Sequence, residues 1–301
     1  MRLKEIERLL QNINFNEVRI GMENGQLSKP YLTNIIAFKK FIEIIENIEV
    51  YEDEIKLLKH SSIYTTTHNA FELSKKEAYQ IFNTSNYLIN STQSLKQVFK
   101  KLLPNSDEQS ISVKLPEPSD FEELNKTMVT FQKTIAQVIV NDEINGVTKI
   151  NNWEFGSFWI EIILGTQAAV ALISSIAWSA AVISKKFNEN KILEQTVRSM
   201  EIKNDSLTDI LESQKKMTSK FIENEAQSVL DNHFTKKEPE QFERLKSAIK
   251  TFAKLIQDGA EIHPSLVAPE KVQNLFPNYK KLDSITTQIK QIEDKKDDSE
   301  S

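Results

Sequence analysis

Four histidines are the side chains best suited to metal binding or proton transfer near neutral pH, because the chain has no cysteine. They are His60, His68, His233 and His263. No two of them have the spacing with which a helix or a zinc finger holds a metal ion. We therefore expect no metal site and no cofactor. The absence of cysteine also excludes disulfide scaffolds, thiolate zinc sites and cysteine nucleophiles.

Acidic pairs are the other groups that could carry acid–base chemistry. Glu52/Glu54 and Glu122/Glu123 lie in strongly charged stretches, where solvated helix faces are the ordinary interpretation. The sequence contains no glycine-rich phosphate loop, nucleotide fingerprint or nucleophile elbow. Its formal net charge of −5 does not favour binding to nucleic acid, which requires a basic stripe. These observations predict a protein without enzymatic activity and without a nucleic-acid footprint.

A weakly polar seam lies in the long apolar stretch Trp153–Phe187. At about 100° per residue, one face of a helix over residues 165–187 gathers small and polar side chains, and the opposite face is apolar. The seam consists of Gln167, Ala171, Ser174, Ser175 and Trp178. A single helix in lipid has no need of such a seam, whereas several copies together would use it to line a pore or a helix–helix contact.

The same stretch carries the features of a membrane span. The segment Thr166–Ile183 would extend about 27 Å at 1.5 Å per residue, close to the thickness of a hydrocarbon core. Aromatic residues precede this segment and lysines follow it, as expected of anchors at membrane interfaces. The predicted anchors are Trp153, Trp159, Lys185 and Lys186.

A buried helix is the alternative interpretation of this stretch. Small residues on one face and apolar residues on the other also suit the central helix of an α+β core. The alternating residues of Ser157–Leu164 predict a strand just before the helix. Glu161 would then lie in that strand and outside the span, which avoids the cost of a carboxylate in hydrocarbon. The sequence leaves both alternatives open.

The fold class follows from long, charged, glycine-poor stretches with apolar residues at helical spacing, which predict a mainly α protein. Alternating apolar residues predict a small α+β module with a short sheet near 111–164. The stretch from Lys186 to about Asn232 has neither proline nor glycine and predicts a long C-terminal coiled-coil-like helix. The expected divisions are a helical N-terminal region (1–110), a strand–helix–strand–strand module (111–164), the hydrophobic helix (165–187), a helical C-terminal region (188–292) and a disordered tail (293–301).

Together these features predict a homo-oligomeric, membrane-associated protein of the ligand- or partner-gated pore or channel type. Its soluble region (1–150) would sense an unknown regulatory ligand or protein, and the helix 165–183 would line or gate a pore in the cytoplasmic membrane. This layout, rather than any motif, resembles that of bacterial membrane effectors of anti-phage defence. The alternative is a soluble, cytoplasmic helical scaffold or interaction protein, in which the helix 165–183 is core and the helix after it binds a partner or forms a dimer.

Overall fold

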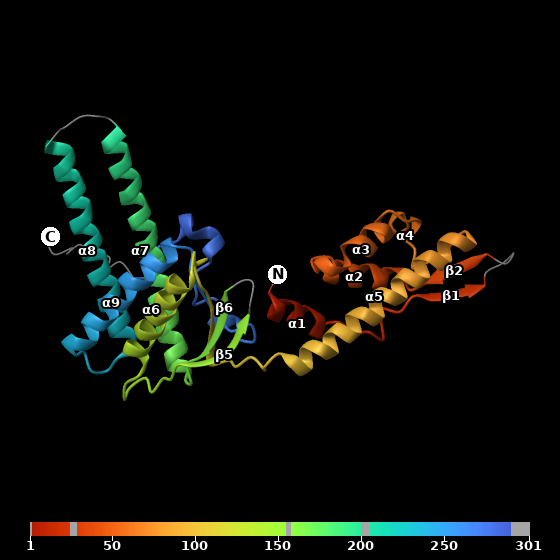
Figure 1. Cartoon of the computed structure of the whole chain (residues 1–301), viewed down its shortest axis with the longest axis horizontal. Coiled ribbons are helices and arrows are strands. Elements are labelled where there is room, and N and C mark those ends of the chain that lie inside the picture. The colour runs from red at the N-terminus through yellow and green to blue at the C-terminus, as the bar shows by residue number, and fades with distance from the viewer. Residues whose placement is uncertain (1, 25–28, 155–157, 200–204, 290–301) are drawn as a thin grey trace, which may run out of the picture. The chain divides into compact units, whose positions relative to one another are not determined.

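Two structural units follow one another along the chain, Met1–Asn105 and Ser106–Ser301. They are seen in a computed structural model that describes residues 2–24, 29–154, 158–199 and 205–289 (Figure 1). The fold is mainly α with a small antiparallel β part, which confirms the predicted fold class. The expected boundary at residue 110 lies near the observed one, and the expected regions 111–164 and 165–187 lie together in the second unit.

In the described part of the N-terminal unit, five helices accompany a three-stranded antiparallel sheet. Helix α5 packs against strands β1 and β2. Ser74 begins α5, and its Oγ accepts a hydrogen bond from the backbone N–H of Glu77 at 3.3 Å, which is the N-cap arrangement expected of serine. The elements are α1 (Leu3–Gln11), β1 (Gly21–Asn24), β2 (Pro30–Thr33), α2 (Ile35–Ile45), a 3-10 turn (Glu49–Tyr51), α3 (Glu52–Lys59), α4 (Ser62–Thr65), β3 (Ala70–Glu72) and α5 (Lys75–Leu102).

The C-terminal unit is built on a four-stranded antiparallel sheet with the order β5-β6-β4-β7. Its strands are β4 (Ser110–Lys114), β5 (Lys149–Glu154), β6 (Trp159–Ile163) and β7 (Glu261–Pro264). Successive side chains of a strand point to opposite faces, so Val113 and its partner Ile160 lie on one face, and Ser112 and its partner Glu161 lie on the other. The short sheet predicted near 111–164 is confirmed, and β7 adds to it from a distant part of the chain.

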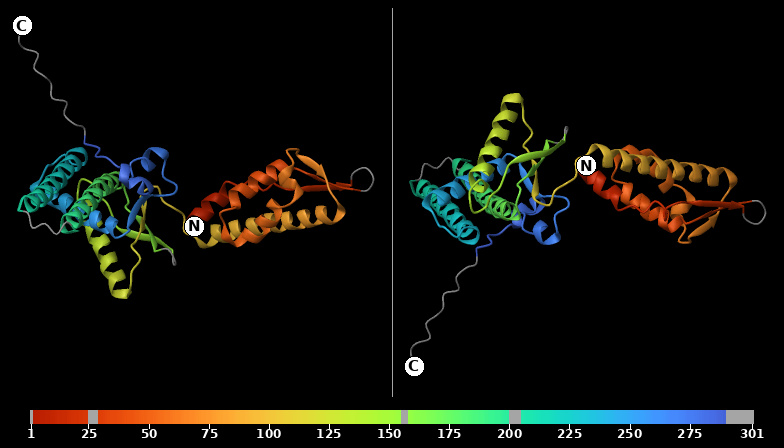
Figure 2. Two further views of the ribbon diagram at one scale, coloured as in Figure 1. Left: turned by 90° about the horizontal axis from the view of Figure 1, so that it is seen from above. Right: turned by 90° about the horizontal axis from the view of Figure 1, so that it is seen from below.

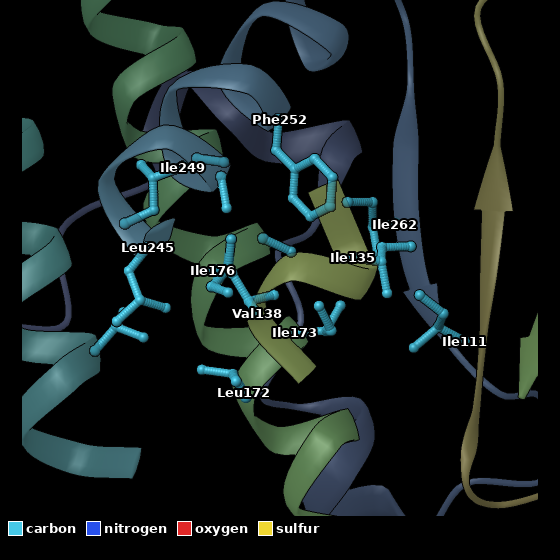
Figure 3. Close-up of a cluster of buried hydrophobic side chains, with 14 of the residues drawn as sticks. Ile111, Ile135, Val138, Leu172, Ile173, Ile176, Leu245, Ile249, Phe252 and Ile262 are labelled. Carbon is cyan, nitrogen blue, oxygen red and sulfur yellow. The ribbon is translucent and has the colours of Figure 1, made fainter. Parts of the chain in front are cut away.

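Four helices accompany this sheet: α6 (Phe121–Ile139), α7 (Gln167–Ser199), α8 (Asp205–His233) and α9 (Pro239–Gln257). A short helix α10 (Glu270–Gln273) and a 3-10 turn (Tyr279–Ser284) follow β7. Helix α7 packs against α8, α9 and β7. Figure 3 shows the core in which strands and helices meet, with side chains that include Ile111, Ile135, Ile173, Phe252 and Ile262.

The apolar stretch divides at Gly165. This residue has a φ of +80°, a conformation that glycine adopts without strain, and it lies between the end of β6 and the start of α7. Thr166 begins the helix, since its Oγ1 accepts from the backbone N–H of Ala169 at 3.0 Å. The predicted strand before this point is confirmed, with Glu161 inside β6.

Two expectations about the C-terminal region differ from the structure. The single helix expected from Lys186 to about Asn232 is divided between α7, which continues past Ile183 to Ser199, and α8, which begins at Asp205. The two helices fold back on each other, so that Nδ2 of Asn190 donates to Oγ1 of Thr218 at 2.8 Å and the polar positions of the two helices satisfy one another. Residues 200–204 lie outside the described residues, as does the predicted tail 293–301. Coiled-coil geometry stays a prediction.

The second difference is that the region 188–292 is not helical throughout. It contains strand β7, and between α10 and residue 289 the described backbone forms only the 3-10 turn. Pro277 interrupts this part, because proline cannot donate a backbone hydrogen bond inside a helix. The helix expected after Pro277 is present only as this 3-10 turn. Beyond it, the carbonyls of Ile285 and Thr286 accept hydrogen bonds from side chains of α7.

Candidate functional site

The polar seam predicted on α7 lies mostly inside the C-terminal unit. Ser174 is buried, Ala171, Ser175 and Trp178 are half-buried, and Gln167 is exposed at the first turn of the helix. The hydroxyl of Ser174 donates to the carbonyl of Ala171 at 2.7 Å, so its hydrogen bond stays within its own helix. Four of the five seam residues are therefore covered by the unit itself.

Two side chains of α8 bond to serines of α7, one of them in the seam. Oγ of Ser175 lies 2.8 Å from Nε2 of His233. One turn further along α7, Oγ of Ser179 donates to Oε2 of Glu225 at 2.6 Å. Ser179 and Glu225 are 4% and 2% exposed, so the polar groups of α7 are satisfied by another helix of the same chain. Sequence reasoning missed both partners, which lie 46 and 58 residues away from the serines they meet.

The segment 285–289 meets another part of α7. Indole Nε1 of Trp178 donates to the carbonyl of Thr286 at 2.9 Å, and Nζ of Lys185 donates to the carbonyl of Ile285 at 3.3 Å. Oγ1 of Thr287 donates to Oε1 of Glu225. Three contacts thus hold this segment against α7 and α8, and Glu225 receives hydrogen bonds from both Ser179 and Thr287.

The predicted interfacial anchors occupy four different settings. Trp153 on β5 is half-buried against the core, and Trp159 begins β6. Lys185 holds the carbonyl of Ile285. Lys186 pairs with Glu189 at 2.9 Å and lies over the ring of Phe221, with its Nζ 5.7 Å from the ring centroid. The structure brings Trp159 into a cluster with residues of β4 and β7.

That cluster joins a carboxylate, an imidazole and an ammonium group. Nε2 of His263 lies 2.7 Å from Oε2 of Glu261, and Nζ of Lys114 lies 2.9 Å from Oε1 of the same carboxylate. The register of β4 and β7 pairs Lys114 with Glu261 directly. The ring of His263 has two aromatic neighbours, Trp159 and Tyr279, with centroid distances of 5.2 and 5.0 Å.

Hydrogen bonding and burial shift the pKa values of two groups in this cluster, Glu261 and Tyr279. Burial opposes ionisation of Glu261, but the hydrogen bonds from Lys114 and His263 outweigh it, so the pKa of Glu261 lies below its ordinary value. An ionised carboxylate only accepts hydrogen bonds, and Nε2 of His263 therefore carries a proton. Burial is also the largest influence on Tyr279 and raises the pKa of its hydroxyl, which accepts a hydrogen bond from the backbone N–H of Ile262 at 2.9 Å.

A cavity of about 470 Å³ lies beside the cluster. Its walls combine aromatic rings with amide and charged groups, a composition that suits recognition of a ligand with both a flat apolar part and hydrogen-bonding atoms. The lining includes Trp178, Glu261, His263, Gln273, Asn274, Phe276, Asn278, Tyr279 and Lys280. Trp178 of the predicted seam thus also borders this cavity.

Sequence reasoning considered His263 only as an isolated histidine and did not select Glu261. A β-strand places residues two apart on one face, so the spacing Glu261–His263 was the signal that could have found the pair. Among the residues that the structure describes, no group of three His, Asp or Glu side chains is arranged to hold a metal ion. The cluster combines an ionised carboxylate with hydrogen-bond donors from His263 and Lys114.

Comparison with known proteins gives a relative that is similar over most of its length. The protein is similar to the uncharacterized protein YqaP of Bacillus subtilis strain 168, with 27% identity over 297 residues, which span 93% of this chain and 94% of YqaP. No protein-family model matches, and no solved structure matches.

Proposed function

We propose that this chain is a soluble, cytoplasmic interaction protein that self-associates through a helical arm, with α7 as the core helix of its C-terminal unit. The helical arm consists of residues 188–199 of α7 and 205–217 of α8, which run side by side beyond α9 in Figure 1. Binding rather than catalysis is the proposed activity.

The observation that carries this proposal is the contrast between the first half of α7, which is buried, and the helical arm, which exposes apolar side chains. Its first half is buried by the unit, and Ser175 and Ser179 find partners on α8. Along the helical arm, large apolar side chains are exposed instead: Ile192 by 63%, Ile210 by 47% and Met217 by 53%. Two helices can cover only one face of each other, and bundles of four helices are the common way to bury the remaining apolar faces.

A second copy of the chain is the partner that the arm suits best. Each copy presents two antiparallel helices, so that two copies related by a two-fold axis would form a four-helix bundle. The arm also carries charged side chains of both signs, among them Glu189, Lys191, Glu212 and Lys215, so that pairing does not bring together surfaces of one sign.

Light scattering coupled to gel filtration tests this proposal without detergent. We expect the wild-type chain to be a dimer at micromolar concentration. Ile192→Lys should dissociate it, because a charge would replace a side chain buried in the bundle. Ser219→Lys is the matched control, since Ser219 is an exposed polar residue that lies on the other side of α8 from Met217, and this variant should remain dimeric. A monomeric wild-type protein contradicts the proposal.

A homo-oligomeric pore-type membrane effector is the second proposal, and the resemblance to anti-phage effectors belongs to it. The residues Gln167–Val197 of α7 are long and apolar enough to cross a bilayer, although 72% of their most apolar window is buried. Insertion would require α7 to exchange His233 and Glu225 for partners in a second copy. Membrane fractionation separates the two proposals: chain that pellets with membranes and needs detergent excludes the soluble one. In the pore proposal, Ser174→Leu or Gln167→Leu changes ion leak or toxicity on expression.

A further inference from the structure

A cavity of about 170 Å³ lies between α6 and the face of the sheet that carries Val113 and Ile160. Phe131 and Ile135 of α6 form its helical wall, and Ile162 of β6 adds to the sheet wall. Its walls are mainly apolar side chains with a few polar groups, a composition that is typical of sites for small molecules. These properties make it a candidate for a ligand site.

The apolar stripe of α6 leads out of this cavity. Phe121, Met128, Phe131 and Ile135 recur at helical spacing along one face. Their exposure falls along the helix, from 82% at Phe121 to 3% at Phe131 and 0% at Ile135. Both views of Figure 2 show the yellow-green α6 extending away from the rest of its unit. One end of the stripe is therefore part of the core, and its other end is exposed.

The polar side chains that line the cavity lie at its mouth. Gln132 of α6 is exposed and Thr148 is half-buried, and both line the cavity. Ile150 lies beside them on the edge strand β5 and is 54% exposed. Hydrocarbon walls with one or two polar groups at the entrance are typical of sites that hold an apolar group and orient it by a single hydrogen bond.

We infer that this cavity binds a small molecule with an apolar ring or branched hydrocarbon group of roughly six to ten carbon atoms and one polar substituent. The hydrocarbon part lies between Phe131, Ile135 and Ile160. The substituent lies at the mouth, where the amide of Gln132 or the hydroxyl of Thr148 bonds to it. The inference is independent of the helical arm and of self-association.

Indole is a suitable probe, because it is a compact ring with one N–H donor. The chain has five methionines, of which Met128 lines the cavity, so methyl-labelled methionine gives a local NMR signal. We expect indole to shift the Met128 signal saturably. Met22 in the N-terminal unit and Met217 on α8 should not shift. No shift at Met128, or equal shifts of all three signals, overturns the inference.

A pair of variants distinguishes binding of indole in the cavity from binding to exposed apolar surface. Ile162→Trp fills the cavity and should weaken indole binding by about tenfold or more. Ile163→Trp is the matched control, because neighbouring residues of β6 point to opposite faces, and it should bind indole as the wild type does. Equal effects of the two variants overturn the inference. If Ile162→Trp does not fold, Gln132→Trp narrows the mouth from an exposed position on α6 and should likewise weaken binding, and unchanged binding there overturns the inference.

Discussion

Oγ of Ser175 lies 2.8 Å from Nε2 of His233, and this contact joins the first third of α7 to the last residue of α8. Burial lowers the pKa of His233 below its ordinary value of 6.5. The imidazole is therefore favoured in its neutral form in the folded protein. The stability of the α7–α8 pair depends on that neutral form.

Acidification should destabilise the C-terminal unit through His233. Because the pKa is lower in the folded than in the unfolded state, the unfolded chain binds more protons as the pH falls below about 6.5. The contribution of neutral His233 is complete above that pH and is lost as the pH falls through the lower, folded-state pKa. Urea unfolding at several pH values between about 5 and 8 measures this loss.

The matched variant for this test is His233→Gln, which can still hydrogen-bond to Ser175 but does not titrate. The free energy of unfolding of the variant should fall less than that of the wild type over the acidic part of this range. Because the other histidines are unchanged, the difference between the two curves reports His233 alone. Parallel curves would contradict the prediction.

The bond between Ser179 and Glu225 should matter more for stability than a hydroxyl that bonds within its own helix. Ser179→Ala removes one hydrogen bond from a carboxylate that is only 2% exposed. We expect a loss of about 1–3 kcal/mol in the free energy of unfolding. Ser174→Ala is the control, because Ser174 is equally buried but bonds to the carbonyl of Ala171. Equal losses in urea unfolding would show that the Glu225 contact contributes nothing of its own.

Two glycines with positive φ, Gly165 and Gly259, are described in the C-terminal unit, and they allow the junction of β6 and α7 to be tested. Gly165→Ala places a methyl group 2.9 Å from Cγ2 of Val147, whereas a methyl group at Gly259 meets nothing within 4 Å. Both changes strain the backbone by about 1–2 kcal/mol, since the φ values are +80° and +100°. Gly165→Ala should therefore lower the melting temperature more than Gly259→Ala. The reverse order would contradict the close packing of this junction.

Local sequence patterns predicted the helices and strands whose type and limits depend on residues close together in the chain. The alternation of Ile111, Val113 and Leu115 predicted β4, and either Ser119 or Asp120 was expected to cap the next helix. In the structure the side chain of Asp120 caps α6, because it accepts from the backbone N–H of Glu123. The division of the apolar stretch near Gly165 was also predicted. In each case the signal lies within about ten residues, where periodicity and capping operate.

Contacts between distant segments were not predictable in the same way. Strand β7 has one fully buried apolar residue, Ile262, between Gly259 and Pro264, and its pairing with β4 joins residues 147 positions apart. The partners of the polar seam are distant for the same reason. The sequence showed that Ser175 needed water or another helix, and only the folded chain identifies His233.

The segment 285–289 should depend on Trp178 for its position. Trp178→Phe keeps an aromatic ring but removes the N–H that donates to the carbonyl of Thr286 at 2.9 Å. Losing this bond should weaken the attachment by about 1 kcal/mol. The backbone N–H of Ile289, which donates to Oγ1 of Thr287 at 3.1 Å, should then exchange with deuterium about fivefold faster. Trp153→Phe makes the same chemical change on β5 and should leave exchange in this segment unaltered. Equal exchange in the wild type and both variants would mean that Lys185 and Thr287 suffice to hold the segment.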